Sequence, residues 1–343
     1  SIDVTLPHTW NATDTVDAQP GYRRGAGWYS KRFRVAENLP EGTRHKLYFE
    51  GANQKAQVFL NGREIGEHIG GYVGFTVELT EHLKHGMENL LQVRVSNEYD
   101  RNLIPSQKAD FFIHGGLTRD VWLQQLPAEH IHSVAITTPK VSRESAQTMV
   151  QVTLDHAPAA QNHKAARLHL TLLDPAGSTV SKSEVAIDGG RAQAKADLPH
   201  VQRPQLWSPD SPQLYTLIAE LQDANGAALH QHRERFGYRW FEMRPNQGFF
   251  VNGERVLIRG THRHEEHAGI GAAMSNAQHR ADMQQIKQMG ANFVRLAHYA
   301  QDPEIYRAAD ELGLILWDEL PWCRGGMGGD AWKQNTERLL REQ

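Results

Sequence analysis

Cysteine is nearly absent from this sequence, since its 343 residues include only one, Cys323. An internal disulfide framework is therefore excluded. Long apolar runs are also missing: none approaches the roughly 20 residues that a membrane-spanning helix needs, so we expect no membrane-embedded segment. The formal net charge of −3 gives no reason to expect a nucleic acid partner. The first residues carry no secretory signal pattern, but a cleaved signal would leave the same trace, so both cytoplasm and periplasm stay open.

The first third of the chain, residues 1–127, is typical of an all-β domain. Polar and apolar residues alternate in short runs such as Lys46–Glu50 and Ala56–Leu60, which indicates strands with one buried face. Asn61-Gly62 follows directly and predicts a tight hairpin, because a type I′ turn needs positive φ at both positions. Many short strands with glycine-rich turns predict a jelly-roll β-sandwich, with tryptophans in its core: Trp10, Trp28 and Trp122.

Residues 128–238 form a second β segment. Strand-like runs such as Val150–Leu154 and Leu168–Leu172 are separated by turn signals such as Asp174-Pro175. About 110 residues with regularly spaced strands predict an immunoglobulin-like β-sandwich, although the Cys…Trp…Cys pattern of antibody domains is absent.

Residues 239–343 change to alternating strands and helices, which predicts βα units and a parallel sheet. Ser275 is a candidate N-cap of a helix that ends near Gly290, and Asp302-Pro303 begins a second helix that Gly313 ends. Polar residues follow the apolar strands in three groups: Arg259 with His262 and His264, Arg295 with His298 and Tyr299, and Asp318 with Glu319. A parallel αβ barrel has its chemistry where its strands end, so we expect these groups to lie together.

The third domain is too short for a complete barrel. A (β/α)8 TIM barrel takes roughly 250 residues, whereas 105 residues follow Tyr238. We therefore expect an incomplete barrel, which either belongs to a longer protein or is completed by another chain. An open parallel edge also favours self-association.

Several strings along the chain resemble those of glycoside hydrolase family 2, which contains β-galactosidases, β-glucuronidases and β-mannosidases. They occur in the family's order from the first domain to the third: Leu6–Trp10, Phe49–Gly51, Val58–Gly62, Gly66–Tyr72, Gly115–Leu123, Trp207–Tyr215, Arg259–Glu265, Arg295–Tyr299 and Asp318-Glu319. The resemblance covers essentially the whole chain. It implies a sugar-binding jelly roll, an immunoglobulin-like domain and the opening of a catalytic barrel.

The resemblance also implies retaining hydrolysis of a terminal β-linked sugar, which needs two carboxyl groups about 5–5.5 Å apart. In this family the acid/base is a glutamate in an Asn-Glu pair after the fourth barrel strand, and the nucleophile is a later glutamate. Asn97-Glu98 lies in the jelly roll and does not match. We therefore expect both catalytic glutamates beyond Gln343, no catalytic residue in this chain and no cofactor.

What the resemblance assigns to this chain is the rest of the sugar pocket. In β-galactosidase-like relatives, histidines of the first and second barrel strands contact the sugar, and so does an aspartate before the Gly-Gly motif. We expect the barrel arginines to orient carboxylates. The expected substrate-binding residues are His264, His298, Asp110, Glu319, Asp318, Trp322, Arg259 and Arg295. Some β-galactosidases hold magnesium through a glutamate and a histidine after the Asp-Glu pair. Cys323 and Gly325 take those positions here, so we expect no metal.

Structural roles compete with these assignments. His264 and His298 are alternatively hydrogen-bonded structural histidines, since the chain has 19 histidines. Asp318-Glu319 is alternatively an ion pair with Arg259 or Arg295. Asp110 is alternatively a loop cap, and Trp322 alternatively packs at the barrel rim instead of stacking on a sugar.

Two classes of function follow. The first is an exo-β-glycosidase that acts on a β-linked oligosaccharide or glycoside. β-Galactosidase is favoured by the first-domain strings and by Asp110, and β-glucuronidase and β-mannosidase are the alternatives. The second class is a non-catalytic carbohydrate-binding protein that uses the jelly roll.

Overall fold

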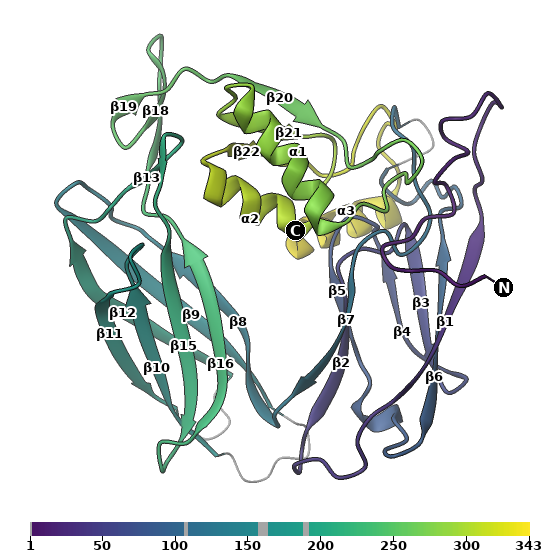
Figure 1. The fold of residues 1–343 in the computed structure, drawn as a ribbon, viewed down its shortest axis with the longest axis horizontal. Helices are drawn as coiled ribbons and strands as arrows, with labels where there is room; N and C mark the ends of the chain where they lie inside the picture. The colour runs from purple at the N-terminus through teal and green to yellow at the C-terminus, as the bar shows by residue number, and fades with distance from the viewer. Residues whose placement is uncertain (1, 106–108, 157–163, 188–191) are drawn as a thin grey trace.

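The computed structural model describes residues 2–105, 109–156, 164–187 and 192–343. It contains two β-sandwiches and, between them, a small parallel sheet with helices (Figure 1). This arrangement confirms the expected fold class of a jelly roll, an immunoglobulin-like sandwich and part of a TIM barrel. No helix among the described residues is long and apolar enough to cross a membrane.

The first sandwich packs two antiparallel sheets, with strand orders β1-β6-β3-β4 and β5-β2-β7. Apolar side chains of both sheets, such as Phe49, Val58 and Val93, fill the space between them. Asn61 and Gly62 both have positive φ, which confirms the predicted hairpin turn. The elements are β1 (Ala26–Arg34), β2 (Arg44–Phe49), β3 (Lys55–Leu60), β4 (Arg63–Ile69), β5 (Phe75–Glu78), the short 3₁₀ helix η1 (Thr80–His82), β6 (Glu88–Ser96) and β7 (Val121–Leu126).

Two of the three tryptophans expected in this core lie outside it. Trp28 is 60% exposed and Trp122 is 50% exposed, whereas Trp10 packs against the core. The expectation was wrong because successive side chains of a strand point to opposite faces. In β1 it is the next residue, Tyr29, that packs against the core, so Trp28 faces outward.

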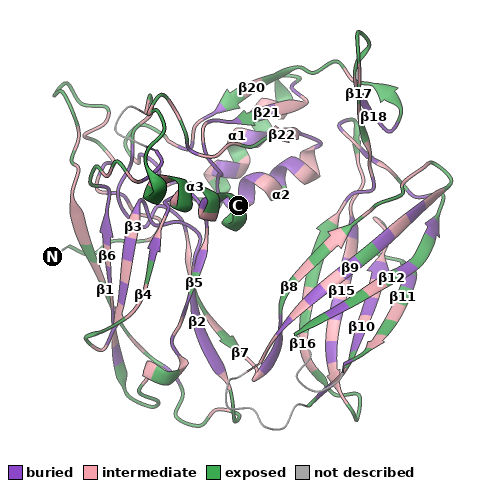
Figure 2. Cartoon of the chain, turned by 180° about the vertical axis from the view of Figure 1, so that it is seen from behind, coloured by how far each residue is buried: buried purple, intermediate pink, exposed green. Residues whose placement is uncertain are grey.

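The second sandwich has sheets of order β11-β10-β15-β16 and β12-β9-β8. Buried residues alternate with more exposed ones along its strands, as Figure 2 shows for both sandwiches. The core includes Val152, Leu170 and Leu217. The strands are β8 (Glu129–Thr137), β9 (Ser145–His156), β10 (Ala165–Leu173), β11 (Thr179–Ala186), β12 (Gln193–Gln202), β13 (Trp207–Ser208), β14 (Ser211–Pro212), β15 (Tyr215–Asp223) and β16 (Ala228–Phe236).

The third unit contains the predicted parallel sheet, in the order β20-β21-β22. Ser275 forms a capping box with Gln278, and the second helix begins after Asp302 and ends at Gly313, which has a φ of 72°. The elements are β17 (Phe241–Arg244), β18 (Gly248–Val251), β19 (Glu254–Arg255), β20 (Gly260–Arg263), α1 (Asn276–Gln288), β21 (Phe293–Leu296), α2 (Pro303–Leu312), β22 (Ile315–Trp317) and α3 (Asp330–Glu342).

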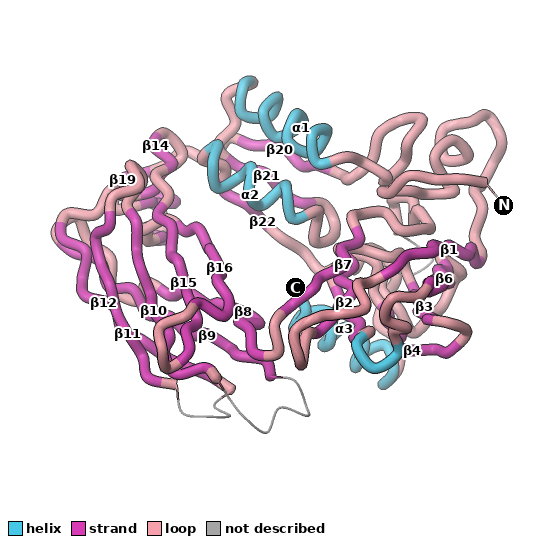
Figure 3. Tube along the Cα trace, turned by 60° about the horizontal axis from the view of Figure 1, so that its bottom comes forward, coloured by secondary structure: helices cyan, strands magenta, loops and turns pink. Residues whose placement is uncertain are grey.

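The helices α1 and α2 lie together along one side of this sheet (Figure 3). Val294 and Leu296 are fully buried with Met283 of α1 and Ile305 of α2. Only this face of the sheet is buried, since the intervening Arg295 is exposed. Its side chain points to the opposite face, where a complete barrel would have its interior.

The third unit contacts both sandwiches. Leu339 of α3 packs with Val73 and Ile104 of the jelly roll. On the other side, the Trp207 indole of the immunoglobulin-like sandwich donates a hydrogen bond to the Asp310 carbonyl at 2.8 Å. The sheet is therefore positioned with the ends of its strands next to the jelly roll (Figure 1).

Candidate functional site

The carboxyl ends of the three parallel strands meet at one edge of the sheet, because Arg263 is in register with Leu296 and Arg295 with Trp317. His264 directly follows β20, and His298 follows β21 by two residues. Their ring centroids are 5.3 Å apart, and the rings are nearly perpendicular, at 77°. Both imidazoles are half-buried, so neither is enclosed in an apolar interior.

The jelly roll contributes the opposite part of this site, through the loop between β6 and β7. The Phe111 ring lies 5.7 Å from the His264 ring and 5.9 Å from the His298 ring, centroid to centroid. It also contacts Tyr299, which stacks on Tyr72 at 4.1 Å. The two domains thus share one aromatic cluster, Tyr72, Phe111, His264, His298 and Tyr299.

His298 is oriented by a carboxylate. Its Nδ1 lies 3.0 Å from Glu319 Oε2, and the Arg295 guanidinium donates two hydrogen bonds to the same carboxylate. Arg295 Nη2 also lies 3.1 Å from His298 Nδ1. Because a carboxylate only accepts, the contact with Glu319 favours the tautomer with hydrogen on Nδ1, and Nε2 then faces the site. Burial alone would raise the pKa of Glu319, but the hydrogen bonds from Arg295 and His298 lower it below its ordinary value. Glu319 is therefore a fixed anion.

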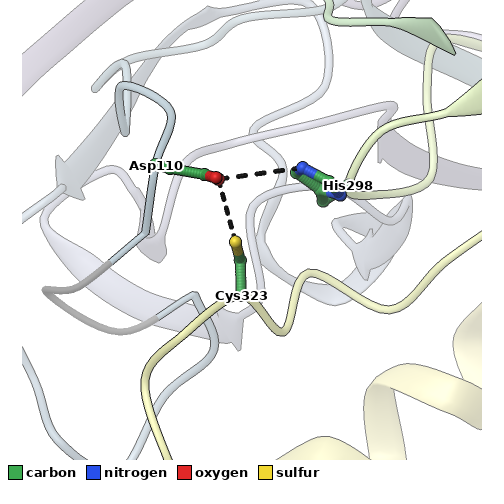
Figure 4. Close-up of side chains that lie close together, drawn as sticks. All are labelled: Asp110, His298 and Cys323. Carbon is green, nitrogen blue, oxygen red and sulfur yellow. Dashed lines mark hydrogen bonds and ion pairs between the residues drawn. The ribbon is translucent and has the colours of Figure 1, made fainter.

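Asp110 lies opposite His298 Nε2 (Figure 4). Its Oδ1 is 3.7 Å from that nitrogen and accepts a hydrogen bond from Cys323 Sγ at 2.8 Å. Its Oδ2 pairs with the Arg324 guanidinium at 3.2 Å. The hydrogen bond from Cys323, followed by the charge of Arg324, lowers the pKa of Asp110.

The other expected substrate-binding residues are Asp318, Trp322 and Arg259. Asp318 accepts a hydrogen bond from the Tyr306 hydroxyl, and Trp322 is half exposed, with its indole donating to the Gly326 carbonyl at 3.0 Å.

The expected position of Arg259 at the carboxyl end of a strand was wrong. The strand begins at Gly260, so Arg259 precedes β20 and lies at its amino end, a strand length away from His264. The ion-pair partner of Glu319 is Arg295.

The sequence placed Tyr299 among the polar residues after its strand but gave it no further role, and it assigned no role to Phe111, Tyr72 or the buried ion pair of Arg119 and Glu265. All but Phe111 lie inside the strings that carry the family resemblance, and Phe111 directly follows Asp110. Their position in those strings was the available signal. Their contacts join residues 146 positions apart in the case of the ion pair, and no local pattern reveals such a contact.

A jelly roll and an immunoglobulin-like sandwich that lead into a parallel αβ sheet, with histidines, carboxylates and aromatic rings at its strand ends, define a carbohydrate-active class of protein. The family models agree along the chain. Residues 3–127 match the sugar-binding domain of glycosyl hydrolases family 2, residues 129–239 match the family 2 model itself, and residues 242–334 match its TIM barrel domain. The chain belongs to glycoside hydrolase family 2.

Named relatives show the same membership. The chain is 50% identical to a putative beta-glucuronidase of Formosa agariphila, over 99% of the chain and 40% of that protein. It is 30% identical to a beta-galactosidase of Thermoanaerobacter pseudethanolicus, over 99% of the chain and 45% of that protein. The crystal structure of a Parabacteroides merdae beta-glucuronidase superposes with a TM-score of 0.92 at 34% identity, covering 99% of this chain and 43% of that one.

The chain spans less than half the length of the relatives named here.

The comparisons do not confirm the preference for β-galactosidase. The relative at 50% identity is named a putative beta-glucuronidase, and the beta-galactosidase is at 30% identity. The alternative, β-glucuronidase, agrees with the comparisons at least as well.

Proposed function

We propose that this chain forms the sugar-binding wall of a retaining exo-β-glycosidase whose substrate is a terminal β-glucuronide. The observation that carries the proposal is the convergence of His264 and His298, from two strand ends, with Asp110 and Phe111 from the jelly roll. The choice of glucuronide is supported by the relatives. A β-galactoside is the second candidate, favoured by the strings of the first domain and by Asp110.

The wall offers the two kinds of contact that a sugar ring requires. Asp110 Oδ1 and His298 Nε2 provide polar atoms for ring hydroxyls, and hydrogen bonds that strengthen in the transition state accelerate cleavage. Phe111 offers an apolar face to the C–H side of the ring, and the half-exposed Trp322 offers another at the rim. In this proposal Arg295 and Glu319 act through His298 and hold its orientation.

The bond-breaking carboxylates are assigned outside this chain. Retaining cleavage needs one carboxyl group as proton donor and another as nucleophile. Glu319 is a poor proton donor, because Arg295 and His298 lower its pKa. Asp318 is engaged by the Tyr306 hydroxyl. The chain therefore binds and orients the sugar, and the whole protein supplies the two glutamates.

Calorimetric titration of the 343-residue chain with methyl β-glucuronide, methyl β-galactoside and methyl β-mannoside tests the binding role. We expect binding of the glucuronide that His298→Ala weakens, while the control His132→Ala, an exposed histidine on β8, leaves the affinity unchanged. Nitrophenyl glycosides of the same sugars test the whole protein, which should hydrolyse the glucuronide, and the isolated chain, which should not.

The outcomes separate the candidates. Faster hydrolysis of the galactoside by the whole protein would replace glucuronide by galactoside as its substrate. Binding without hydrolysis by the whole protein would indicate a carbohydrate-binding protein. Turnover by the isolated 343-residue chain would refute the assignment of the carboxylates.

A further inference from the structure

Three side chains with different ligand atoms face one another where the jelly roll meets the barrel sheet (Figure 4). Asp110 comes from the loop between β6 and β7, His298 follows β21, and Cys323 follows β22. Their ligand atoms, Oδ1, Nε2 and Sγ, all lie within 4.8 Å of one another. Asp110 Oδ1 is between the other two, 2.8 Å from the sulfur and 3.7 Å from the nitrogen.

This combination of ligand atoms suits a cation of intermediate softness. Zinc binds cysteine sulfur at about 2.3 Å and histidine nitrogen or carboxylate oxygen at about 2.0–2.2 Å, usually in tetrahedral geometry. Ligand atoms around such an ion are then roughly 3–4 Å apart. Here the oxygen lies 2.8 Å from the sulfur and 3.7 Å from the nitrogen, and no two of the three atoms are more than 4.8 Å apart, so the separations are close to those around one ion.

The groups behind these ligands are also arranged as in a metal site. A metal-binding histidine almost always donates its second ring N–H to a carboxylate, a carbonyl or water, which fixes the tautomer. Here His298 Nδ1 is 3.0 Å from Glu319 and 3.1 Å from Arg295 Nη2. With the hydrogen on Nδ1, as the contact with the carboxylate favours, Nε2 keeps its lone pair for a ligand. Arg324 engages Asp110 through Oδ2 only, at 3.2 Å, and leaves Oδ1 directed at the cluster.

We propose that Asp110, His298 and Cys323 bind a thiophilic divalent cation such as Zn²⁺, and that the bound cation blocks the sugar pocket. On binding, the S–H bond of Cys323 breaks, its proton leaves to solvent and a metal–sulfur bond forms, with no change of oxidation state. Three protein ligands leave a fourth position for water. The inhibitory part of the proposal rests on the proposed function, because two of its ligands, Asp110 and His298, are assigned there to the sugar.

Calorimetric titration of the 343-residue chain with Zn²⁺, without chelator or sugar, tests the site. We expect one equivalent to bind. Changing a residue that hydrogen-bonds to a metal ligand typically lowers metal affinity by about 10–100-fold. Removing a ligand should cost at least as much. Cys323→Ala and His298→Ala should therefore each weaken Zn²⁺ binding by about 100-fold or more. His132→Ala is the matched control for loss of an imidazole, and Mg²⁺ is the control for a cation that prefers oxygen ligands.

Co²⁺ reports on sulfur ligation directly, because a cobalt–thiolate bond has a charge-transfer absorption. We expect this absorption with the unchanged chain and its loss in Cys323→Ala, whose folding is checked by circular dichroism. Undiminished Zn²⁺ affinity in a folded Cys323→Ala, or Co²⁺ binding without the absorption, would overturn the site.

The inhibitory effect is measured separately, as the affinity for methyl β-glucuronide with a chelator and with saturating Zn²⁺. We expect Zn²⁺ to weaken sugar binding in the unchanged chain but not in Cys323→Ala, each compared with its own Zn²⁺-free value. Equal sugar affinity with and without Zn²⁺ would refute the inhibition. A chain that binds Zn²⁺ through Cys323 but binds no sugar with the chelator present would refute the proposed function and leave the metal site standing.

Discussion

Arg119 of the jelly roll and Glu265 of the barrel sheet form a buried ion pair, with Nε and Oε1 2.9 Å apart and side chains 2% and 4% exposed. The guanidinium also donates to the carbonyls of Ala300 and Tyr72 at 2.7 and 3.1 Å. Burial alone would lower the pKa of Arg119, but the charges of Glu265 and Asp302 raise it. Since Glu265 is adjacent to His264, this pair fixes the distance between the jelly roll and the barrel histidines.

Arg119→Met should destabilise the chain strongly, because it leaves the Glu265 carboxylate buried without its partner. Breaking a buried ion pair from one side costs about 3–5 kcal/mol. Urea unfolding followed by fluorescence measures the loss. Arg143→Met is the control, since Arg143 pairs with Glu254 at an exposed site, where a pair contributes about 0–1 kcal/mol. Equal losses in the two variants would show that the buried pair does not hold the domains together.

Asp302 should make stability decrease as pH rises. Burial, followed by the charge of Glu265, raises its pKa from 3.8 to about 7 in the folded chain. Between these values the folded state keeps a proton that the unfolded state has lost, so the free energy of unfolding falls as pH rises. At about 1.4 kcal/mol per pKa unit, the loss is at most about 4 kcal/mol.

Asp302→Asn removes this titration and keeps a good N-cap for α2. The difference in unfolding free energy between the two chains, measured from pH 4 to pH 7.5, reports Asp302 together with its 3.7 Å contact to His279, whose own pKa is lowered to about 4. A difference that does not change with pH would mean that Asp302 is ionised throughout.

The elements of this fold were predictable where their signals are local. The helix limits at Ser275, Asp302 and Gly313 follow from capping chemistry, and the Asn61-Gly62 turn follows from positive φ. The outward position of Trp28 was not predictable from its type, because strand alternation fixes the period but not which face is buried.

The candidate site was predictable only in part. The adjacent strand ends bring His264 and His298 together, and the resemblance supplied Asp110. Phe111 and Arg119 act across domains, and their contacts depend on how the jelly roll docks on the sheet. The apolar residues before Arg259 suggested a strand that ends at Arg259. The strand β20 instead begins one residue later, so Arg259 lies at its amino end.

Gly313→Ala should destabilise the chain more than Gly290→Ala. Both glycines end a helix with positive φ, so each substitution carries the left-handed strain of about 1–2 kcal/mol. A Cβ at Gly313 would also lie 2.3 Å from the Pro209 carbonyl oxygen of the immunoglobulin-like domain, whereas one at Gly290 meets open space. Urea unfolding of both variants makes the comparison. Equal losses would mean that the Pro209 loop moves aside without cost.

The sheet edges should drive self-association. Among the described residues, β20 and β22 are the outer strands of the parallel sheet, and Trp317 of β22 is 59% exposed. An exposed strand edge with an apolar side chain favours pairing with a second copy. Light scattering should therefore show a dimer or larger species that Trp317→Glu converts to monomer. Trp28→Glu, at an equally exposed tryptophan of the jelly roll, should have no such effect.

Glu319→Gln should weaken sugar binding through His298, without contacting the sugar itself. The neutral amide accepts a weaker hydrogen bond from Nδ1 than the carboxylate does, and it leaves Arg295 without its partner. A hydrogen bond to a charged group contributes about 1.5–3 kcal/mol, so the affinity for methyl β-glucuronide should fall by about 10–100-fold.

The ¹⁵N shifts of the imidazole distinguish orientation from mere loss of stability. In the unchanged chain they should report hydrogen on Nδ1, and in Glu319→Gln a mixture of the two tautomers. Glu311→Gln is the control, because Glu311 pairs with Arg235 and Arg280 at the surface of the other side of the unit. Its substitution should change neither the tautomer nor the affinity. If Glu319→Gln kept full affinity with an altered tautomer, then the sugar would not be bound through His298 Nε2, and the wall would have to be built from Asp110 and the aromatic rings alone.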